Sequence, residues 1–170
     1  MIPFPETTEY NPYYTQYIQS YEGENVLEFL EKGLIEVNDL MASLTEEKLK
    51  SAYAEGKWTI KEVLQHIMDT ERIFCNRALR FARNDKTELP GFEQDDYVPY
   101  SGANERDSMG MLREYNAIRQ ATITLFQGFS DEMLARVGVA SGSDMSVRAI
   151  AHVVTGHERH HMNVIKERYL

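Results

Sequence analysis

The residues with the clearest chemical potential are two histidines near the end of the chain, His157 and His161. They share a helical stripe with apolar residues on both sides, of which Val154 and Val164 are the nearest. Histidines four residues apart on an α-helix place both imidazole rings over the same point in space. Neutral imidazole is a common ligand for zinc, nickel, iron and copper. We therefore predict that this pair forms part of a metal site.

His157, Glu158 and His161 also spell the H-E-x-x-H pattern of zinc proteases, in which the glutamate is the general base. That interpretation needs a third ligand further along the chain, and only nine residues follow His161. The metzincin extension fails as well, because Val164 and Glu167 stand where it requires glycine and histidine. The third ligand is therefore expected upstream.

Three other histidines are available, and His66 is the best candidate among them. His152 lies about 140° around the helix from His157, and His160 lies about 100° from the stripe, so both are interpreted as surface or helix-contact residues. His66 belongs to another predicted helix and can meet the pair inside a bundle. A site of three histidines with an open position is typical of catalytic metal sites. A buried histidine that only makes hydrogen bonds is the alternative for His66.

Four long segments have the apolar spacing of helices and must position these histidines: residues 24–44, 60–82, 104–129 and 146–170. Thr59 and Glu62 form a capping box before the second segment, and Asn104 and Ser146 are the expected caps of the third and fourth. A short extra turn is expected at 130–134 and a Gly/Ser loop at 138–144. No segment shows the alternation of a strand.

The connection between the second and third helices is unusually long. Residues 84–103 contain Pro90, Pro99 and an acidic run, and a connection of this length suits a crossover between parallel neighbours. The sequence therefore predicts an all-α fold, a four-helix bundle with a long crossover between helices 2 and 3. We expect one domain over residues 1–170, in which 1–22 form an extended N-terminal arm that lies along the body.

Composition narrows the classes of partner. The chain has 170 residues, a formal net charge of −9 and a pI near 5.1. These values argue against nucleic acid and against an anionic membrane surface, which both need clustered Lys and Arg. Cys75 is the single cysteine, so no intrachain disulfide forms, which fits a reducing compartment. No signal peptide is evident, and we expect a cytoplasmic protein whose partner is a small-molecule substrate.

Two short motifs stand out in the second and last helical segments: Trp58-Thr59-x-x-Glu62-x-x-x-His66 followed by Asp69, and Gly156-His157-Glu158-x-His160-His161. With these motifs in order, essentially the whole chain resembles the DinB/YfiT-like family of metal-binding four-helix bundles. Carried over residue by residue, the family's three metal-binding histidines fall on His66, His157 and His161. The resemblance implies nickel or zinc as the bound metal, a homodimer, and a transferase or isomerase that uses a low-molecular-weight thiol.

Three functions follow as hypotheses. The first is a metal-dependent transferase that joins a small thiol to an electrophilic substrate, and the resemblance favours it. The second is a metal-dependent hydrolase that activates water, and the third is a non-catalytic bundle that binds a metal or a small ligand. Cys75 is expected to be a small buried hydrophobe rather than the reacting thiol, because it lies about 13 Å along the helix from His66.

Other side chains are weaker candidates. Asp69 and Glu158 could orient a histidine ring, although for Glu158 we favour an ordinary surface charge. Glu62 is explained by its capping role. Three arginines of the second helix could hold an acidic thiol or form an ordinary solvated face, namely Arg72, Arg80 and Arg83. Three aromatic residues could line the mouth of a pocket if the long loop folds over it, namely Trp58, Tyr97 and Tyr100. The methionines are interpreted as core filler.

Overall fold

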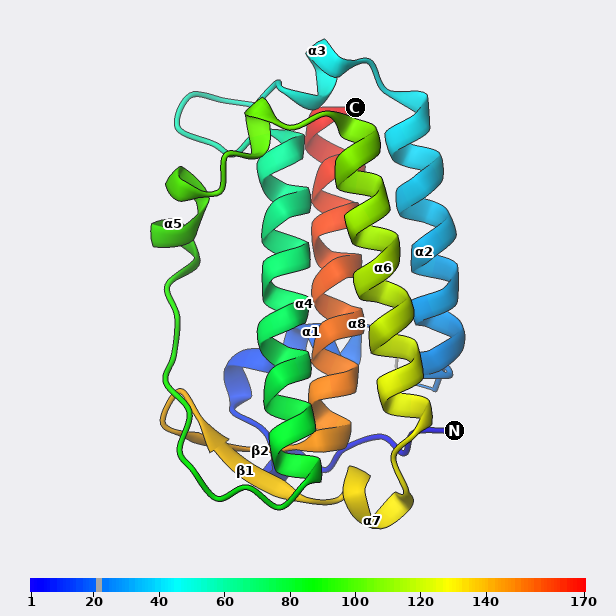
Figure 1. Cartoon of the computed structure of the whole chain (residues 1–170), viewed down its shortest axis with the longest axis vertical. Coiled ribbons are helices and arrows are strands. Elements are labelled where there is room, and N and C mark those ends of the chain that lie inside the picture. Colours follow the sequence, from blue (N-terminus) through cyan, green and yellow to red (C-terminus); the bar gives the residue numbers. More distant parts are fainter. Residues whose placement is uncertain (21–22) are drawn as a thin grey trace.

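The computed structural model describes residues 1–20 and 23–170, and it is a four-helix bundle (Figure 1). The four long helices are α2 (Val26–Ser43), α4 (Ile60–Ala82), α6 (Ser108–Gln127) and α8 (Val147–Val164). Helix α8 packs against α2 and α4, and α6 packs against the same two helices on the other side. Consecutive helices α2 and α4 are therefore diagonal to each other. The predicted all-α bundle is confirmed.

The long connection is the expected crossover. Helices α4 and α6 both run downward in Figure 1, and the chain between them climbs back along the outside of the bundle. This crossover contains three short helical pieces, α5 (Gln94–Tyr97), η3 (Val98–Tyr100) and η4 (Ala103–Glu105). It passes the pocket described below, so it forms part of a wall as well as a connection.

Capping side chains fix where the long helices begin. The hydroxyl of Thr59 accepts from the Glu62 amide and the Glu62 carboxylate accepts from the Thr59 amide, as predicted. Ser146 caps α8, also as predicted. The cap of α6 is Asp107 and not Asn104. The side chain of Asn104 instead accepts from the Thr59 hydroxyl, which draws the end of the crossover onto the start of α4.

One sequence prediction about the smaller elements was wrong, namely the Gly/Ser loop. Residues 138–144 belong to a hairpin of β1 (Val137–Ala140) and β2 (Ser143–Ser146), whose turn contains Ser141 and Gly142 at positive φ. Two residues at positive φ match the right-handed twist of the strands, and four-residue strands are too short to show alternation. Helix α7 (Asp131–Leu134) precedes the hairpin, at the expected short turn.

The N-terminal arm does lie along the body, but it is not extended. It contains the 3₁₀ turns η1 (Thr7–Glu9) and η2 (Pro12–Tyr14) and the helix α1 (Thr15–Gln19). Tyr17 and Ile18 of α1 are buried, and the helix packs on α8. The end of the predicted arm, residues 21 and 22, lies outside the described residues. Helix α3 (Glu46–Leu49) covers the other end of the bundle, and a π-helical turn, η5 (Ile165–Tyr169), continues α8.

The core consists of two apolar clusters, one toward each end of the bundle. One includes Leu30, Phe74 and Phe126, and the other includes Val37, Leu64 and Tyr115. Between them, each of α4, α6 and α8 contributes polar residues to a buried middle layer. None of the described helices is long and apolar enough to cross a membrane.

Candidate metal centre

His66, His157 and His161 meet in the middle layer of the bundle. The Nε2 atom of His157 lies 2.9 Å from that of His66 and 3.1 Å from that of His161. One ligand atom from each of the three residues lies within 4.8 Å of the others. His66 and His157 are buried, and His161 is half-buried. The structure therefore brings together one histidine of α4 and two of the four histidines of α8.

The surroundings keep these imidazoles neutral. Burial lowers the pKa of His66 to about 4. Burial and the neighbouring imidazoles of His66 and His160 lower the pKa of His161 to about 3. The pKa of His157 also lies well below its ordinary value, mainly because of burial. All three rings are therefore uncharged at neutral pH, the state in which histidine binds a metal.

The donor set fits a divalent transition metal. Zinc–nitrogen bonds of about 2.0–2.1 Å put the nitrogens of a tetrahedral site roughly 3.4 Å apart, close to the separations of the Nε2 atoms. Without a metal, each of these short contacts needs a proton on one Nε2 atom, whereas a cation between the rings accepts the Nε2 lone pairs of all three histidines. The other ring nitrogen of His66, Nδ1, lies 3.4 Å from the Thr70 hydroxyl. Sequence reasoning missed this contact.

Close backbone packing holds aromatic side chains around the histidines. A Cβ atom at Gly156 would lie 2.0 Å from the Tyr17 carbonyl oxygen, so glycine is needed where α1 crosses α8. The crossing places the Tyr17 ring 5.6 Å from the ring of His157. On the other side, the Trp58 ring lies 5.0 Å from that of His66. Aromatic rings thus shield part of the site from water.

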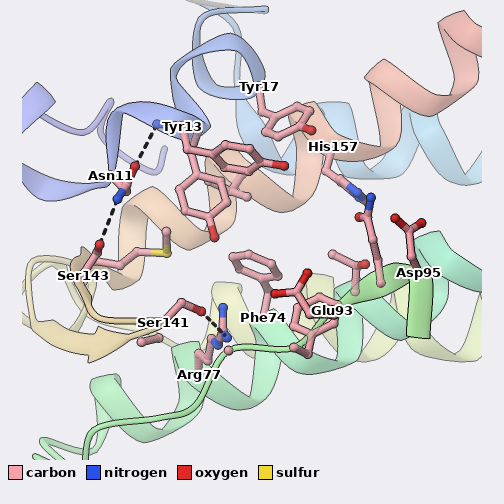
Figure 2. A pocket seen from close by; sticks show the side chains of 18 residues that line it. Asn11, Tyr13, Tyr17, Phe74, Arg77, Glu93, Asp95, Ser141, Ser143 and His157 are labelled. Carbon is pink, nitrogen blue, oxygen red and sulfur yellow. Dashed lines mark hydrogen bonds between the residues drawn. The ribbon is translucent and has the colours of Figure 1, made fainter. Parts of the chain in front are cut away.

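A pocket of about 440 Å³ extends from His157 toward the hairpin (Figure 2). Its wall comes from five parts of the chain, namely the N-terminal arm, α4, the crossover, the β1–β2 hairpin and α8. In Figure 2, His157 and Asp95 lie at one end, and Arg77 and Ser141 at the other. The pocket gives a small molecule access to His157, the one member of the histidine cluster that lines it. Of its lining residues, the sequence analysis had singled out only His157 as a site residue.

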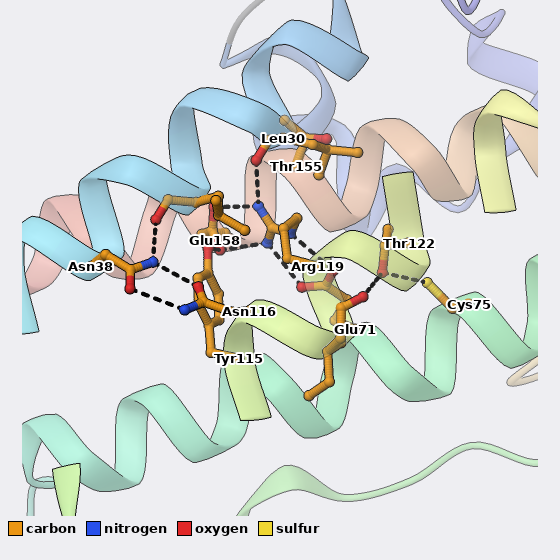
Figure 3. A network of polar contacts seen from close by, with 12 residues as sticks. Leu30, Asn38, Glu71, Cys75, Tyr115, Asn116, Arg119, Thr122, Thr155 and Glu158 are labelled. Atoms are coloured by element: carbon orange, nitrogen blue, oxygen red, sulfur yellow. Dashed lines mark hydrogen bonds and ion pairs between the residues drawn. The ribbon is translucent and has the colours of Figure 1, made fainter. Parts of the chain in front are cut away.

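Glu158 is not a surface charge, and that interpretation was wrong. It is 5% exposed, accepts from the Tyr115 hydroxyl at 2.7 Å and is paired with the guanidinium of Arg119 (Figure 3). Arg119 also donates to both carboxylate oxygens of Glu71. The polar spacing suggested a solvated face, but the middle of α8 is covered by α1, α2 and α4. Glu158 therefore faces away from the histidine cluster, into the centre of the bundle.

The remaining candidates are explained without a metal. Asp69 accepts from Gln65, and no described contact joins it to the three histidines. Burial raises the pKa of Cys75 to about 12, which keeps its thiol protonated beside Thr122. His152 is buried against Pro3 and Phe4 of the arm, as a helix-contact residue.

The predicted cationic row and the whole predicted aromatic rim, including Trp58, lie outside the pocket. Arg72 pairs with Glu114, Arg80 pairs with Asp85, and Arg83 lies over Phe129, so the interpretation of these arginines as an ordinary solvated face holds. Tyr97 and Tyr100 are exposed, and neither lines the pocket. The crossover covers the pocket with an earlier stretch, Gly91 to Asp95.

Comparison with known proteins identifies the family to which the chain belongs. The sequence model of the DinB superfamily matches residues 30–165. The match covers most of the chain, so the protein belongs to the DinB superfamily. A protein of Oceanobacillus iheyensis, whose name assigns it provisionally to the metal-dependent hydrolases, is 25% identical over 133 residues, which are 76% of this chain and 75% of that protein. A Geobacillus thermodenitrificans protein with the same provisional name is 22% identical, over 71% of this chain and 69% of its own.

Two solved structures share the fold. YfiT from Bacillus subtilis, described as a probable metal-dependent hydrolase with an unusual four-helix bundle topology, superposes with a TM-score of 0.74 at 17% identity, over 94% of this chain and 91% of its own. A mycothiol-dependent maleylpyruvate isomerase superposes with a TM-score of 0.68 at 11% identity, over 86% of this chain and 61% of its own. At these identities, the likeness concerns the fold.

Proposed function

We propose that the protein is a divalent-metal-dependent enzyme in which His66, His157 and His161 hold the metal, and that it transfers a small thiol to an electrophilic substrate. The observation that carries the proposal is the convergence of three neutral imidazoles, one of which, His157, lines one end of a 440 Å³ pocket. When bound, a metal such as zinc or nickel lowers the pKa of a bound thiol or water and holds the resulting anion near the electrophile.

The chain's own residues contribute position and shielding. The rings of Tyr17 and Trp58 pack beside the histidines and restrict access of water. The pocket volume lies within the range of small-molecule sites. Because the pocket continues beyond His157 along α4, it offers room for an electrophile beside a small thiol. The mycothiol-dependent activity of the isomerase that shares the fold is consistent with this choice.

Hydrolysis is the second candidate, with water in place of the thiol. The provisional names of the two sequence relatives favour it. Two exposed carboxylates of the crossover, Glu93 and Asp95, also line the pocket and could accept a proton from water. Dependence of the rate on an added thiol separates the two candidates.

The test begins with metal content. Purified protein is expected to contain about one transition-metal ion per chain, and His161→Ala is expected to lose most of it, because two imidazoles hold a metal more weakly than three. His160→Ala is the matched control, since His160 is the exposed neighbour on α8. Equal metal in the parent and in His161→Ala would remove His161 from the site.

Turnover is then measured on the metal-loaded protein. Glutathione, cysteine or N-acetylcysteine is combined with 1-chloro-2,4-dinitrobenzene, and a sulfur–carbon bond forms as chloride leaves and the thiol proton passes to solvent. We expect thiol-dependent product that disappears on chelation and returns on reloading. Ester cleavage without any thiol would favour the hydrolase, and a folded, metal-loaded protein without either reaction would contradict the enzymatic proposal.

A further inference from the structure

Arg77 of α4 is a buried cation that lines the pocket. It is 3% exposed, and its Nη2 atom donates to the Pro90 carbonyl oxygen at 3.0 Å and to the Ser141 hydroxyl at 3.1 Å. Its guanidinium lies over the rings of Phe74 and Phe92, at 5.1 Å and 5.9 Å. Among the described residues, no carboxylate lies within ion-pair distance of Arg77. A guanidinium has five N–H donors, so these contacts leave donors for a further partner.

Comparison with Arg119 shows that a buried arginine without a carboxylate partner is unusual in the described chain. Arg119 is the other buried arginine of the described chain, and it is paired with both Glu71 and Glu158. Burial lowers the pKa of Arg77, partly offset by the nearby Tyr14 hydroxyl. A buried charge without a counter-ion is costly and is normally paired. The missing negative charge at Arg77 therefore points to a ligand.

The backbone around Arg77 is built to present it to the pocket. Ser141, which orients the guanidinium, has a φ of 53°, a conformation that costs energy for a residue with a side chain. A Cβ atom at Gly91 would lie 3.3 Å from the Ser141 hydroxyl, so the crossover packs tightly against the hairpin there. Arg77 is thus held between two loops rather than left to move.

Arg77 also has a defined distance from the candidate metal centre. His66, Thr70, Phe74 and Arg77 follow one another on the same face of α4. Eleven residues of helix separate the Cα atoms of His66 and Arg77 by about 16 Å along the axis. In Figure 2, the guanidinium and His157 lie at opposite ends of the pocket. The acidic groups of Glu93 and Asp95 belong to the exposed crossover, where solvent screens their charge.

We propose that Arg77 binds a carboxylate of the reacting small molecules, so that the substrate class is an organic acid whose reactive atom lies at the histidine end of the pocket. This inference rests on the proposed function, because it describes the substrate of the same pocket. Because Nη2 is already bonded to Pro90 and Ser141, the N–H groups of Nη1 and Nε remain to donate charge-assisted hydrogen bonds to a carboxylate. The apolar rings of Phe74 and Phe92 enclose the contact and strengthen it.

The carboxylate can come from the electrophile or from the thiol, and matched ligand pairs separate the two sources. N-acetylcysteine is compared with N-acetylcysteine amide, and 4-phenylbutyrate with 4-phenylbutyramide. Within each pair, the amide lacks the negative charge and has an NH₂ donor in place of one of the two acceptor oxygens. Dissociation constants for the zinc-loaded protein are measured by calorimetry at pH 7.

For at least one pair, we expect the acid to bind roughly tenfold to a hundredfold more tightly than the amide, the range of charge-assisted hydrogen bonds. In Arg77→Gln this preference should disappear, while zinc content stays at the parental value. Arg113→Gln, which removes an exposed arginine of α6, should keep the preference. A preference in the thiol pair alone assigns the carboxylate to the thiol, and one in the other pair alone assigns it to the electrophile.

Two results would overturn the inference: equal binding of acid and amide by the parent in both pairs, or an unchanged preference in Arg77→Gln. If Arg77→Gln does not fold, Arg77→Lys takes its place, because lysine keeps the positive charge but lacks the N–H donors that the guanidinium holds in fixed positions. A several-fold weaker preference is then expected, and an unchanged one overturns the inference. Binding needs no turnover, so an inactive protein that prefers acids through Arg77 would contradict the proposed enzyme and leave the acid site standing.

Discussion

At the scale of single residues, burial decides what each charged or titratable side chain does. His66 and His157 lose their charge because they are buried among neutral groups. Arg119 keeps its charge because two carboxylates surround it, and they hold its pKa well above the ordinary value in spite of burial. Arg77 has no such partner in the described chain. We therefore assign structural stability to Arg119 and the proposed ligand binding to Arg77.

Arg119 provides the residue-scale prediction. Arg119→Met leaves Glu71 and Glu158 buried without a cation, and we expect the free energy of unfolding to fall by about 3–5 kcal/mol. The measurement is urea unfolding at pH 7. Arg72→Met is the control, because Arg72 and Glu114 form a more exposed pair, and it should cost less than about 1 kcal/mol. Equal losses in both variants would show that the buried cluster has no special structural role.

At the scale of elements, the contacts of α8 explain why one helix carries most of the candidate site. It is covered by α1, α2 and α4, so its middle turns have no broad solvated face. One side presents His157 and His161 to α4, and another presents Glu158 to Arg119. The N-terminal arm completes the cover, because α1 crosses α8 directly over Gly156. The arm is therefore part of the site.

Gly156→Ala tests the role of this crossing. The added methyl group would overlap the Tyr17 backbone, which must move away from α8. We expect a loss of about 1–3 kcal/mol in the free energy of unfolding and easier access of solvent to His157, seen as faster hydrogen exchange in α1. Gly128→Ala is the control, since its nearest atoms would lie at an ordinary 3.5 Å. An unchanged α1 would mean that the crossing tolerates a side chain.

At the scale of the whole molecule, the bundle stacks a polar layer between two apolar clusters. The layer contains the three histidines and the Arg119 cluster, and the pocket opens one side of it to small molecules. Folding buries these groups together, so the stability of the metal-free protein depends on the protonation of its histidines.

The metal-free protein should become less stable as the pH falls from about 6.5 toward 4. An unfolded histidine takes up a proton near pH 6.5, whereas His66 and His152 do so only near pH 4 in the folded state. The unfolded state therefore binds more protons within this window, and each such histidine costs up to about 1.4 kcal/mol per pH unit. Urea midpoints at pH 7.5, 6.5 and 5.5 measure the loss.

The loss in this window can be assigned to histidines, because carboxylates with a lowered pKa lose their contribution at lower pH. Burial raises the pKa of Asp69, and that change has the opposite sign, because the folded state then binds the extra proton as the pH falls. Hydrogen bonds from Lys61 and Ser108 lower the pKa of Glu46 to about 2, and its contribution is lost only below about pH 4.5. His66→Asn should show a smaller loss between pH 6.5 and 5.5 than the parent. Identical midpoints across the window would contradict the burial of neutral histidines.

Local sequence was enough to predict the bundle and its crossover, and to select three histidines that the structure brings together. Helical periodicity, the Thr59–Glu62 capping box and the i, i+4 spacing of His157 and His161 act over a few residues, so they can be read directly from the chain. The predicted beginning of α6 was wrong, because Asn104 and Asp107 are both good capping residues. The side chain of Asn104 makes long-range hydrogen bonds with Thr59 and Glu62 instead of capping the helix.

Only the tertiary structure decided which polar groups are inside. Glu158 was interpreted as a surface charge because nothing local shows that Arg119, 39 residues earlier, lies opposite it. Arg77 was passed over for Arg72, Arg80 and Arg83, although it shares a helix face with His66. Its importance depends on the hairpin and the crossover, which bury it without supplying a carboxylate. Spacing determines which face of a helix a residue occupies, but packing determines what that face meets.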